Sequence, residues 1–102
     1  RDDKEAETFI HQLIKHLQPA EGCLMLDVAC GKGRHSKILA ALGFDVTGID
    51  LAPASIAWAK QWENEGLHFF VHDMRLPFYS NYFNYNYSIN VMNSFGILHP
   101  CP

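Results

Sequence analysis

The sequence predicts an α/β domain in which helices flank a parallel sheet. Two observations support this fold class: short apolar runs alternate with one-sided amphipathic segments, and glycine or proline separates most of them. Strands joined by helices of this length pair in parallel through right-handed crossovers. The 102 residues suffice for about one small domain. An apolar content of 48% with 19% charged residues is typical of a globular chain and argues against disorder.

The first half of the chain contains two predicted helices and two predicted strands. Residues 5–18 carry an apolar stripe on one side, which predicts a helix. The short apolar run 23–29 predicts a strand buried on both faces. A second helical face follows, and we expect it to end at Gly43, a residue type that suits the position after a helix. Residues 44–49 predict the second strand.

The second half contains one predicted helix and two predicted strands. Pro53 suits the first turn of the helix, whose buried face we expect to include Trp62 and which we expect Gly66 to end. Residues 67–71 are rich in aromatic and branched side chains, which predicts the third strand. After a polar loop, residues 85–92 predict the fourth strand.

Charge and hydropathy exclude several classes of function. Eight basic against eleven acidic residues give a net charge of -3, and no basic stripe exists, so we expect no nucleic-acid partner. No apolar run is long enough to span a bilayer, so we expect no membrane partner. The start of the chain does not resemble a signal peptide. These observations together favour a cytoplasmic protein.

The cysteines and histidines predict no metal centre. Cys23, Cys30 and Cys101 make an odd count without a secretory signal, which predicts reduced thiols in a cytosolic protein. His68 and His72 would share a strand face, but a lone pair of this kind is more often incidental than metal-binding.

The first candidate for chemistry is the turn after the first strand. In parallel sheets, ligands bind outside the carboxyl ends of the strands. Gly31 and Gly33 lie there, and without a Cβ they let the backbone turn sharply and approach a ligand closely. A plain strand-to-helix turn explains this pair about equally well.

Two aspartates lie at the ends of the next two strands. Asp50 follows Gly31 by nineteen positions and could accept both hydroxyls of a ribose, or could instead interact with a helix N-terminus. Asp73 could bind the exocyclic amine of an adenine while Met74 packs on the ring; alternatively, Asp73 pairs with Arg75 at the surface. Because each signal falls at the end of a successive strand, together they predict a nucleoside site.

These segments resemble one enzyme family. Residues 26–36, LDVACGKGRHS, resemble the glycine motif of class I S-adenosylmethionine-dependent methyltransferases. Residues 46–51 resemble the second motif of that family and residues 71–75 the third. Residues 90–96 are similar to a later segment of one bacterial, small-molecule-type branch. The resemblance covers roughly residues 5–96 and implies a Rossmann-like sheet of seven strands, about four of them in this chain.

The resemblance also implies a cofactor and residues that hold it. S-adenosylmethionine would be the cofactor, and the methyl acceptor a small molecule that the sequence does not identify. By position, the implied cofactor contacts are Asp27, Ala29, Gly31 and Gly33 at the methionine moiety, Asp50 and Leu51 at the ribose and adenine, Asp73 and Met74 at the adenine, and Asn90 near the transferable methyl. The family often has glycine at the Ala29 position, so the methyl there would crowd the loop slightly.

No catalytic residue is predicted. Methyl transfer from a sulfonium is an in-line displacement from an activated leaving group, so the protein mainly aligns and desolvates the reactants. Candidates for contact with the acceptor are His35, His72, Asn90 and Asn93, although a structural role is favoured for each.

The chain departs from the family pattern in its last part. The resemblance provides no counterpart for the last three strands, so we expect residues 1–102 to be a partial methyltransferase domain, truncated to its cofactor-binding half. In the fourth strand polar residues alternate with apolar ones, which suits a half-exposed strand. Such a strand would be an unpaired edge open to self-association.

Two other functions are compatible with these residues. A non-enzymatic remnant would bind the cofactor weakly or not at all. A nicotinamide dinucleotide domain would use Gly31, Gly33 and, in the third-glycine place, Ser36, together with Asp50. Asp27 and Asp73 do not belong to that second pattern.

Overall fold

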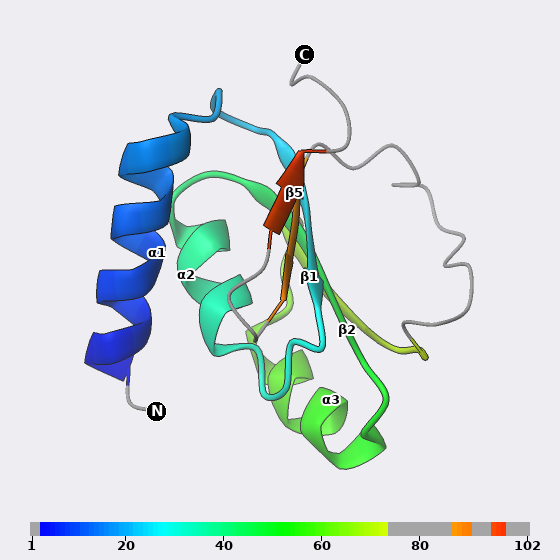
Figure 1. Ribbon diagram of the computed structural model, residues 1–102. Coiled ribbons are helices and arrows are strands. Elements are labelled where there is room, and N and C mark those ends of the chain that lie inside the picture. The colour runs from blue at the N-terminus through cyan, green and yellow to red at the C-terminus, as the bar shows by residue number, and fades with distance from the viewer. Residues whose placement is uncertain (1–2, 74–86, 91–94, 98–102) are drawn as a thin grey trace.

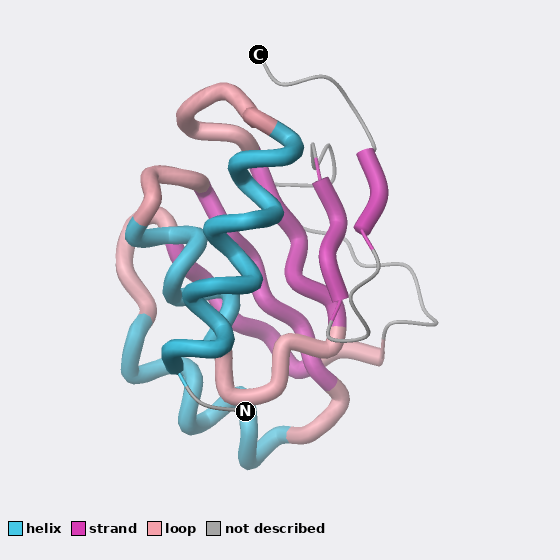
Figure 2. Tube along the Cα trace, turned by 60° about the vertical axis from the view of Figure 1, so that its left-hand side comes forward, coloured by secondary structure: helices cyan, strands magenta, loops and turns pink. Residues whose placement is uncertain are grey.

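The protein has two layers, a five-stranded sheet and a set of helices that lies on one of its faces (Figures 1 and 2). The computed structural model describes residues 3–73, 87–90 and 95–97. The elements are α1 (Asp3–Leu17), β1 (Leu24–Val28), α2 (Arg34–Ala41), β2 (Asp45–Asp50), α3 (Pro53–Ala59), the 3-10 helix η1 (Lys60–Trp62), β3 (Leu67–Val71), β4 (Tyr87–Asn90) and β5 (Phe95–Ile97).

The sheet confirms the predicted α/β class. Its strand order is β3-β2-β1-β4-β5, and the first four strands are parallel. β5 is antiparallel to β4 and pairs with its outer edge. The expectation that β4 forms an unpaired edge is therefore wrong. An antiparallel neighbour needs only a short connection, whereas parallel strands need a long crossover. Residues 95–97 can therefore pair with β4 soon after it ends, and they precede Pro100 and Pro102 in the chain.

The core lies between the helices and the sheet. Apolar side chains from all three helices and from the first three strands form one cluster there. Its largest fully buried members are Phe69, Ile10, Met25, Leu39, Ile56, Leu67 and Val46. In β1, burial alternates, so this strand is fully buried on the helix side and half-buried on the other face, contrary to the predicted burial on both faces.

The third helix ends earlier than predicted. α3 stops at Ala59, and η1 continues only to Trp62, whose side chain lies at the surface rather than on the buried face. The chain leaves the helix because Glu63 is extended and Asn64 pairs with Leu67 through two backbone hydrogen bonds. This tight turn includes residues that we expected to be helical because Gly66 was predicted to end the helix.

The cysteines differ from each other. Cys23 is disulfide-bonded, so the prediction of three reduced thiols is wrong for this residue. Cys30 is a free thiol and is buried. The argument for a cytoplasmic location from reduced cysteines therefore no longer holds.

Two glycines make room for the ring of Phe69. In the register of the sheet, Asp27, Gly48 and Phe69 form one row across β1, β2 and β3. A Cβ at Gly48 would lie 2.7 Å from Cδ1 of Phe69 and 2.9 Å from Sγ of Cys30. A Cβ at Gly33, at the start of α2, would lie 2.6 Å from Cζ of the same ring. The missing side chains thus let an aromatic ring fill the space between the sheet and the start of α2.

Adding a methyl group at this contact should destabilise the fold. We expect Gly48→Ala to lower the free energy of unfolding by about 1–3 kcal/mol, the usual cost of overpacking. Phe69→Leu in the same chain should reduce that penalty, so that the two substitutions are not additive. Urea unfolding of both single variants and the double variant measures the coupling.

Gly66→Ala is the matched control, because a Cβ there meets ordinary van der Waals distances, the nearest being 3.7 Å. Equal losses from Gly48→Ala and Gly66→Ala would contradict the proposed role of the ring.

Candidate functional site

The carboxyl ends of β1, β2 and β3 meet at one edge of the sheet (Figure 1). The amide of Cys30 donates a hydrogen bond of 2.9 Å to the carbonyl of Ile49, which ties the loop after β1 to β2. The amide of His72 donates a bond of 2.9 Å to the carbonyl of Asp50, which ties the residues after β3 to the end of β2. The three segments that the sequence predicted as a site therefore lie side by side.

The loop after β1 has left-handed backbone at every second residue. The φ angles are +58° at Ala29, +59° at Gly31 and +84° at Gly33. For alanine this conformation costs about 1–2 kcal/mol. Glycine suits the Ala29 position because of this φ angle, a reason different from the crowding that the sequence suggested.

The two glycines of this loop have different roles. A Cβ at Gly31 would meet no atom within 4 Å, so the backbone there faces open space. Gly33, by contrast, lies against the ring of Phe69 inside the protein. Gly31 is thus the residue at which a ligand can approach the backbone, and Gly33 supports the packing of α2 on the sheet.

Asp50 connects the loop with the start of α3. Its Oδ2 accepts a hydrogen bond of 2.8 Å from the amide of Gly31, and its Oδ1 accepts one of 2.8 Å from the amide of Ala52. Ala52 is the N-cap of α3, so Asp50 lies just before the start of that helix. Each carboxylate oxygen can accept more than one hydrogen bond, so both retain acceptor capacity.

Asp27 lies behind the loop in the protein interior. The side chain is 1% exposed, and its Oδ2 accepts a hydrogen bond of 2.6 Å from the hydroxyl of Ser36 in α2. Its Oδ1 is buried with no hydrogen-bond partner among the described residues. Burial raises the pKa of Asp27 to about 7; the Ser36 hydroxyl opposes this shift and the charge of Asp50 adds to it.

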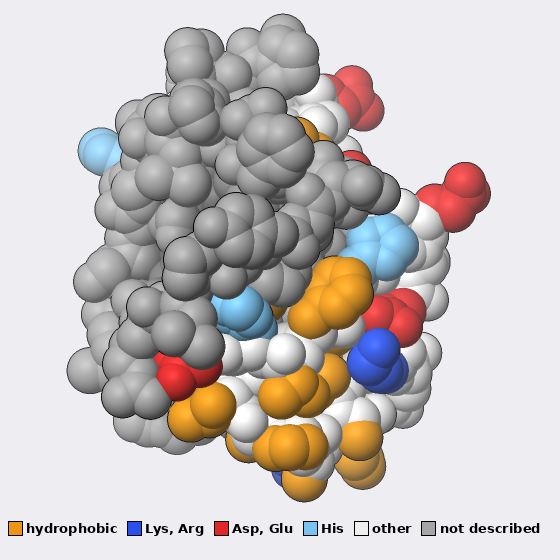
Figure 3. Space-filling model, turned by 90° about the vertical axis from the view of Figure 1, so that its right-hand side faces the viewer, with side chains coloured by type: hydrophobic (Ala, Val, Ile, Leu, Met, Phe, Trp, Pro, Cys, Tyr) orange, Lys and Arg blue, Asp and Glu red, His pale blue; other side chains and the backbone are white. Residues whose placement is uncertain are grey.

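The other predicted residues differ in their exposure and in their distance from the loop in the chain. Leu51, directly after Asp50, is 63% exposed and is part of the apolar surface at the ends of β2 and β3. Figure 3 shows apolar side chains gathered on that side of the molecule. Asp73 and His72 are half-buried beside it. Asn90 ends β4, with its backbone in register with Val28 of β1.

Four of the predicted contacts lie away from this edge or have side chains outside the described residues. Met74, Asn93 and the side chain of Asn90 are outside the described residues. His35 lies between α1 and α2, with its ring 5.2 Å from that of Phe9. Burial, and secondly the charge of Arg34, lower the pKa of His35. This position favours its structural role.

The described residues, 3–73, 87–90 and 95–97, provide neither a metal site nor a membrane-spanning helix. No group of three His, Cys, Asp or Glu side chains in those residues is arranged to hold a metal ion. No helix among them has the length and apolarity needed to cross a membrane.

Comparison with known proteins identifies the family. The profile of a methyltransferase domain matches residues 26–99, which is most of the chain. The chain belongs to the methyltransferase domain family. The match includes the loop after β1, Asp50 and Asp73, and it contradicts the alternative of a nicotinamide dinucleotide domain.

Individual methyltransferases agree with this assignment. The ubiquinone biosynthesis O-methyltransferase of Azorhizobium caulinodans is 39% identical over 51 residues, which are 50% of this chain and 20% of that protein. A TehB-like S-adenosylmethionine-dependent methyltransferase from Corynebacterium glutamicum is 28% identical with a TM-score of 0.68, over 81% of this chain and 44% of that one.

A third relative was solved with a cofactor product. The plantazolicin methyltransferase BpumL, in complex with S-adenosylhomocysteine, is 25% identical with a TM-score of 0.62, over 83% of this chain and 33% of that one. The cofactor of the family is thus S-adenosylmethionine. The chain spans about a fifth of the length of the curated relatives it matches.

Sequence reasoning missed three residues that support the candidate site. Ser36 appeared only as a substitute for a third glycine, yet its hydroxyl binds Asp27. Gly48 and Phe69 were treated as ordinary strand residues. A glycine inside an apolar strand often marks a close approach of another group, so Gly48 was the available signal.

The buried Asp27 predicts a pH-dependent stability. Its pKa is raised from 3.8 to about 7 in the fold, so the folded protein keeps a proton that the unfolded chain releases between those values. The contribution of Asp27 to stability is therefore fully present below about pH 4 and is lost as pH rises to about 7. We expect Asp27→Asn to flatten this decline and to stabilise the fold near pH 8, measured by urea unfolding from pH 4 to 8.

The control is Glu7→Gln, which removes an exposed carboxyl from α1. An unchanged decline in Asp27→Asn would show that another group carries the pH dependence.

Proposed function

We propose that this chain binds S-adenosylmethionine at the carboxyl ends of β1, β2 and β3 and serves methyl transfer to a small molecule. The proposal for the acceptor is supported by the names of the relatives, which include ubiquinone biosynthesis O-methyltransferases and the plantazolicin methyltransferase. Residues 1–102 would constitute the cofactor-binding part of the domain.

The observation that carries the proposal is the position of Asp50. Its carboxylate is fixed by the amides of Gly31 and Ala52, at the junction of the glycine loop and the end of β2. A carboxylate held in this way is already oriented before a ligand arrives. Its remaining acceptor sites suit the two hydroxyls of a ribose, which are neighbouring donors.

The residues around Asp50 would contact the rest of the cofactor. Exposed Leu51 offers apolar surface to the adenine, and Asp73 offers an acceptor for its exocyclic amine. Met74 and Asn90 are proposed by position in the family motifs, at the adenine and near the methyl group. The open side of Gly31 and the neighbouring Ala29 would face the methionine moiety.

Asp27 has a positioning role in this proposal. Its bond to Ser36 joins β1 to α2 across the base of the loop. The carboxylate is buried, so it would act on the methionine moiety through the loop that it supports.

The bound cofactor would supply an activated methyl group on a sulfonium. The chain would align that group with the acceptor and exclude water from it, and no residue is assigned as a general base. The alternative is a domain that binds the cofactor without turnover. Product formation with a quinol-type phenol as acceptor, followed with a radiolabelled methyl group, separates the two; binding without any transfer would favour the second.

Removal of the Asp50 carboxylate should weaken cofactor binding. We expect Asp50→Ala to raise the Kd for S-adenosylhomocysteine by roughly 100-fold, since charge-assisted hydrogen bonds of about 1.5–3 kcal/mol each are lost. Isothermal titration calorimetry at pH 7.5 measures the change.

Asp45→Asn provides the control for this experiment, because it alters an aspartate at the opposite end of the same strand. If Asp50→Ala and Asp45→Asn bind the ligand equally well, Asp50 does not hold the ribose.

A side chain at Gly31 should interfere with the ligand while leaving the protein interior undisturbed. Gly31 and Gly22 both have left-handed φ angles, +59° and +81°, and a Cβ at either would meet no protein atom within 4 Å. Gly31→Ala and Gly22→Ala should therefore each lower the free energy of unfolding by about 1–2 kcal/mol. Only Gly31→Ala should raise the Kd for S-adenosylhomocysteine, as calorimetry and thermal unfolding of both variants would show.

Gly22→Ala thus corrects for backbone strain. An equal, small effect of both substitutions on affinity would place the ligand away from Gly31.

A further inference from the structure

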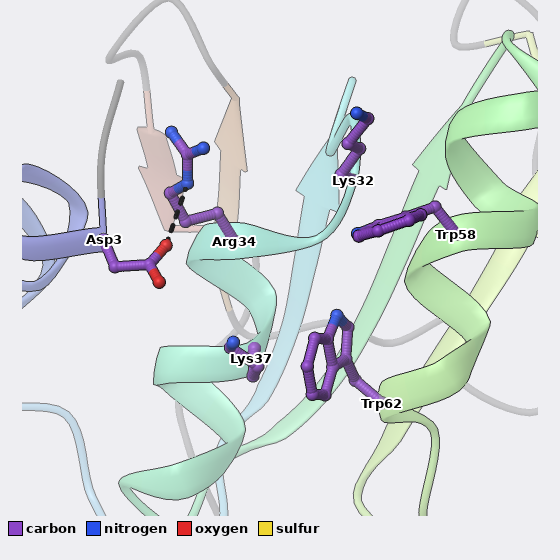
Figure 4. A pocket seen from close by; sticks show the side chains of 6 residues that line it. All are labelled: Asp3, Lys32, Arg34, Lys37, Trp58 and Trp62. Carbon is purple, nitrogen blue, oxygen red and sulfur yellow. Dashed lines mark ion pairs between the residues drawn. The ribbon is translucent and has the colours of Figure 1, made fainter.

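A hollow on the outer surface lies between the start of α2 and the α3–η1 segment (Figure 4). Its volume is about 290 Å³, near the lower end of small-molecule pockets. The residues that line it are Asp3, Lys32, Arg34, Lys37, Trp58 and Trp62. We call this hollow the tryptophan groove. Of the predicted cofactor contacts, none lines it.

The two indoles in the groove lie outside the core cluster. The buried face of α3 is formed by Ile56 and Ala59. Trp58 is 55% exposed and Trp62 36% exposed, although burying large aromatic side chains is strongly favourable. Both side chains point from the α3–η1 segment toward α2 (Figure 4). Their exposed surface is therefore available to a ligand.

Two lysines are held against these indoles. Nζ of Lys37 lies 3.9 Å from the ring centroid of Trp62, and Nζ of Lys32 lies 5.2 Å from that of Trp58. Such cation–π contacts restrict the long side chains before any ligand binds. Among the residues that the structure describes, no carboxylate forms an ion pair with either lysine.

The groove carries a local positive charge in an acidic chain. Arg34 pairs with Asp3 at 3.3 Å, both partly exposed. The three basic side chains and this one carboxylate sum to a local charge of +2, whereas the whole chain has -3. A ligand that binds here should therefore be an anion with about two negative charges.

We propose that the tryptophan groove binds a small phosphate monoester that carries a planar ring. A phosphate monoester has a charge of roughly -1.5 to -2 at pH 7 and would match the local charge. Its oxygens would accept hydrogen bonds from the ammonium groups of Lys32 and Lys37, and its ring would pack on exposed indole surface. S-adenosylmethionine fits these features poorly, because it has no phosphate and carries a sulfonium.

Intrinsic fluorescence gives a local measurement of this binding. The chain contains two tryptophans, and both line the groove. Phenyl phosphate is titrated into the 102-residue chain at pH 7.5, with excitation of tryptophan alone. We expect a saturable change in emission, and about tenfold weaker binding of inorganic phosphate, which lacks the ring. Phenol, which lacks the charge, should give no saturable change.

Charge variants test the assignment of the site. Lys32→Met and Lys37→Met should each weaken phenyl phosphate binding about tenfold, since each removes a charge-assisted hydrogen bond. Lys15→Met, on the exposed face of α1, is the matched control and should leave the affinity unchanged. Circular dichroism of all three variants checks that each of them folds.

Several results would overturn the proposal. The first is the absence of a saturable signal up to about 10 mM phenyl phosphate. The second is equal affinity of Lys37→Met and Lys15→Met for phenyl phosphate. The third is displacement of phenyl phosphate by S-adenosylhomocysteine, which would place the probe in the cofactor site. Binding of a single-stranded oligonucleotide without binding of phenyl phosphate would also contradict it, in favour of a nucleic-acid surface. Because none of the proposed cofactor contacts lines the groove, its test does not depend on the proposed methyltransferase activity.

Discussion

The ring of Phe69 occupies the space that two glycines leave open, and this contact determines how closely α2 approaches the sheet. Gly48 lets the ring lie over the middle of β2, and Gly33 lets the start of α2 come down onto it. With α2 at this distance, the hydroxyl of Ser36 reaches Asp27 and the amide of Gly31 reaches Asp50. The geometry of the glycine loop is thus a consequence of packing in the core beneath it.

Two aspartates at this edge of the sheet have opposite environments and so different roles. Asp27 is buried, one of its oxygens has no hydrogen-bond partner in the described part of the chain, and its pKa is raised to about 7. Asp50 is half-buried, and its carboxylate accepts hydrogen bonds from two backbone amides at the point where a ligand would bind. The first supports the loop from inside, and the second presents acceptors outside. Both aspartates lie near the carboxyl end of a strand. Their different burial gives Asp27 a positioning role and leaves Asp50 as the proposed binding residue.

The start of α2 connects the proposed cofactor site with the tryptophan groove. Lys32 lies between the two glycines of the loop, yet its side chain extends toward Trp58 in the groove. The loop after β1 would thus offer its backbone to one proposed ligand and a side chain to the other. A phosphate ester bound at Lys32 would contact the loop directly, so the two sites share one structural element while they differ in charge and chemistry.

By itself, the sequence determined the fold class and the alternation of helices with parallel strands, because hydrophobic periodicity is a local property of the chain. It also determined the family, through the spacing of Gly31, Asp50 and Asp73. The tertiary structure alone decided what depends on contacts between distant segments. The pairing of β5 with β4, the exposure of Trp62 and the burial of Asp27 are of this kind. So are the separate roles of Gly31 and Gly33, which share a residue type and a left-handed φ angle. The ring of Phe69, 36 residues further along the chain, distinguishes them.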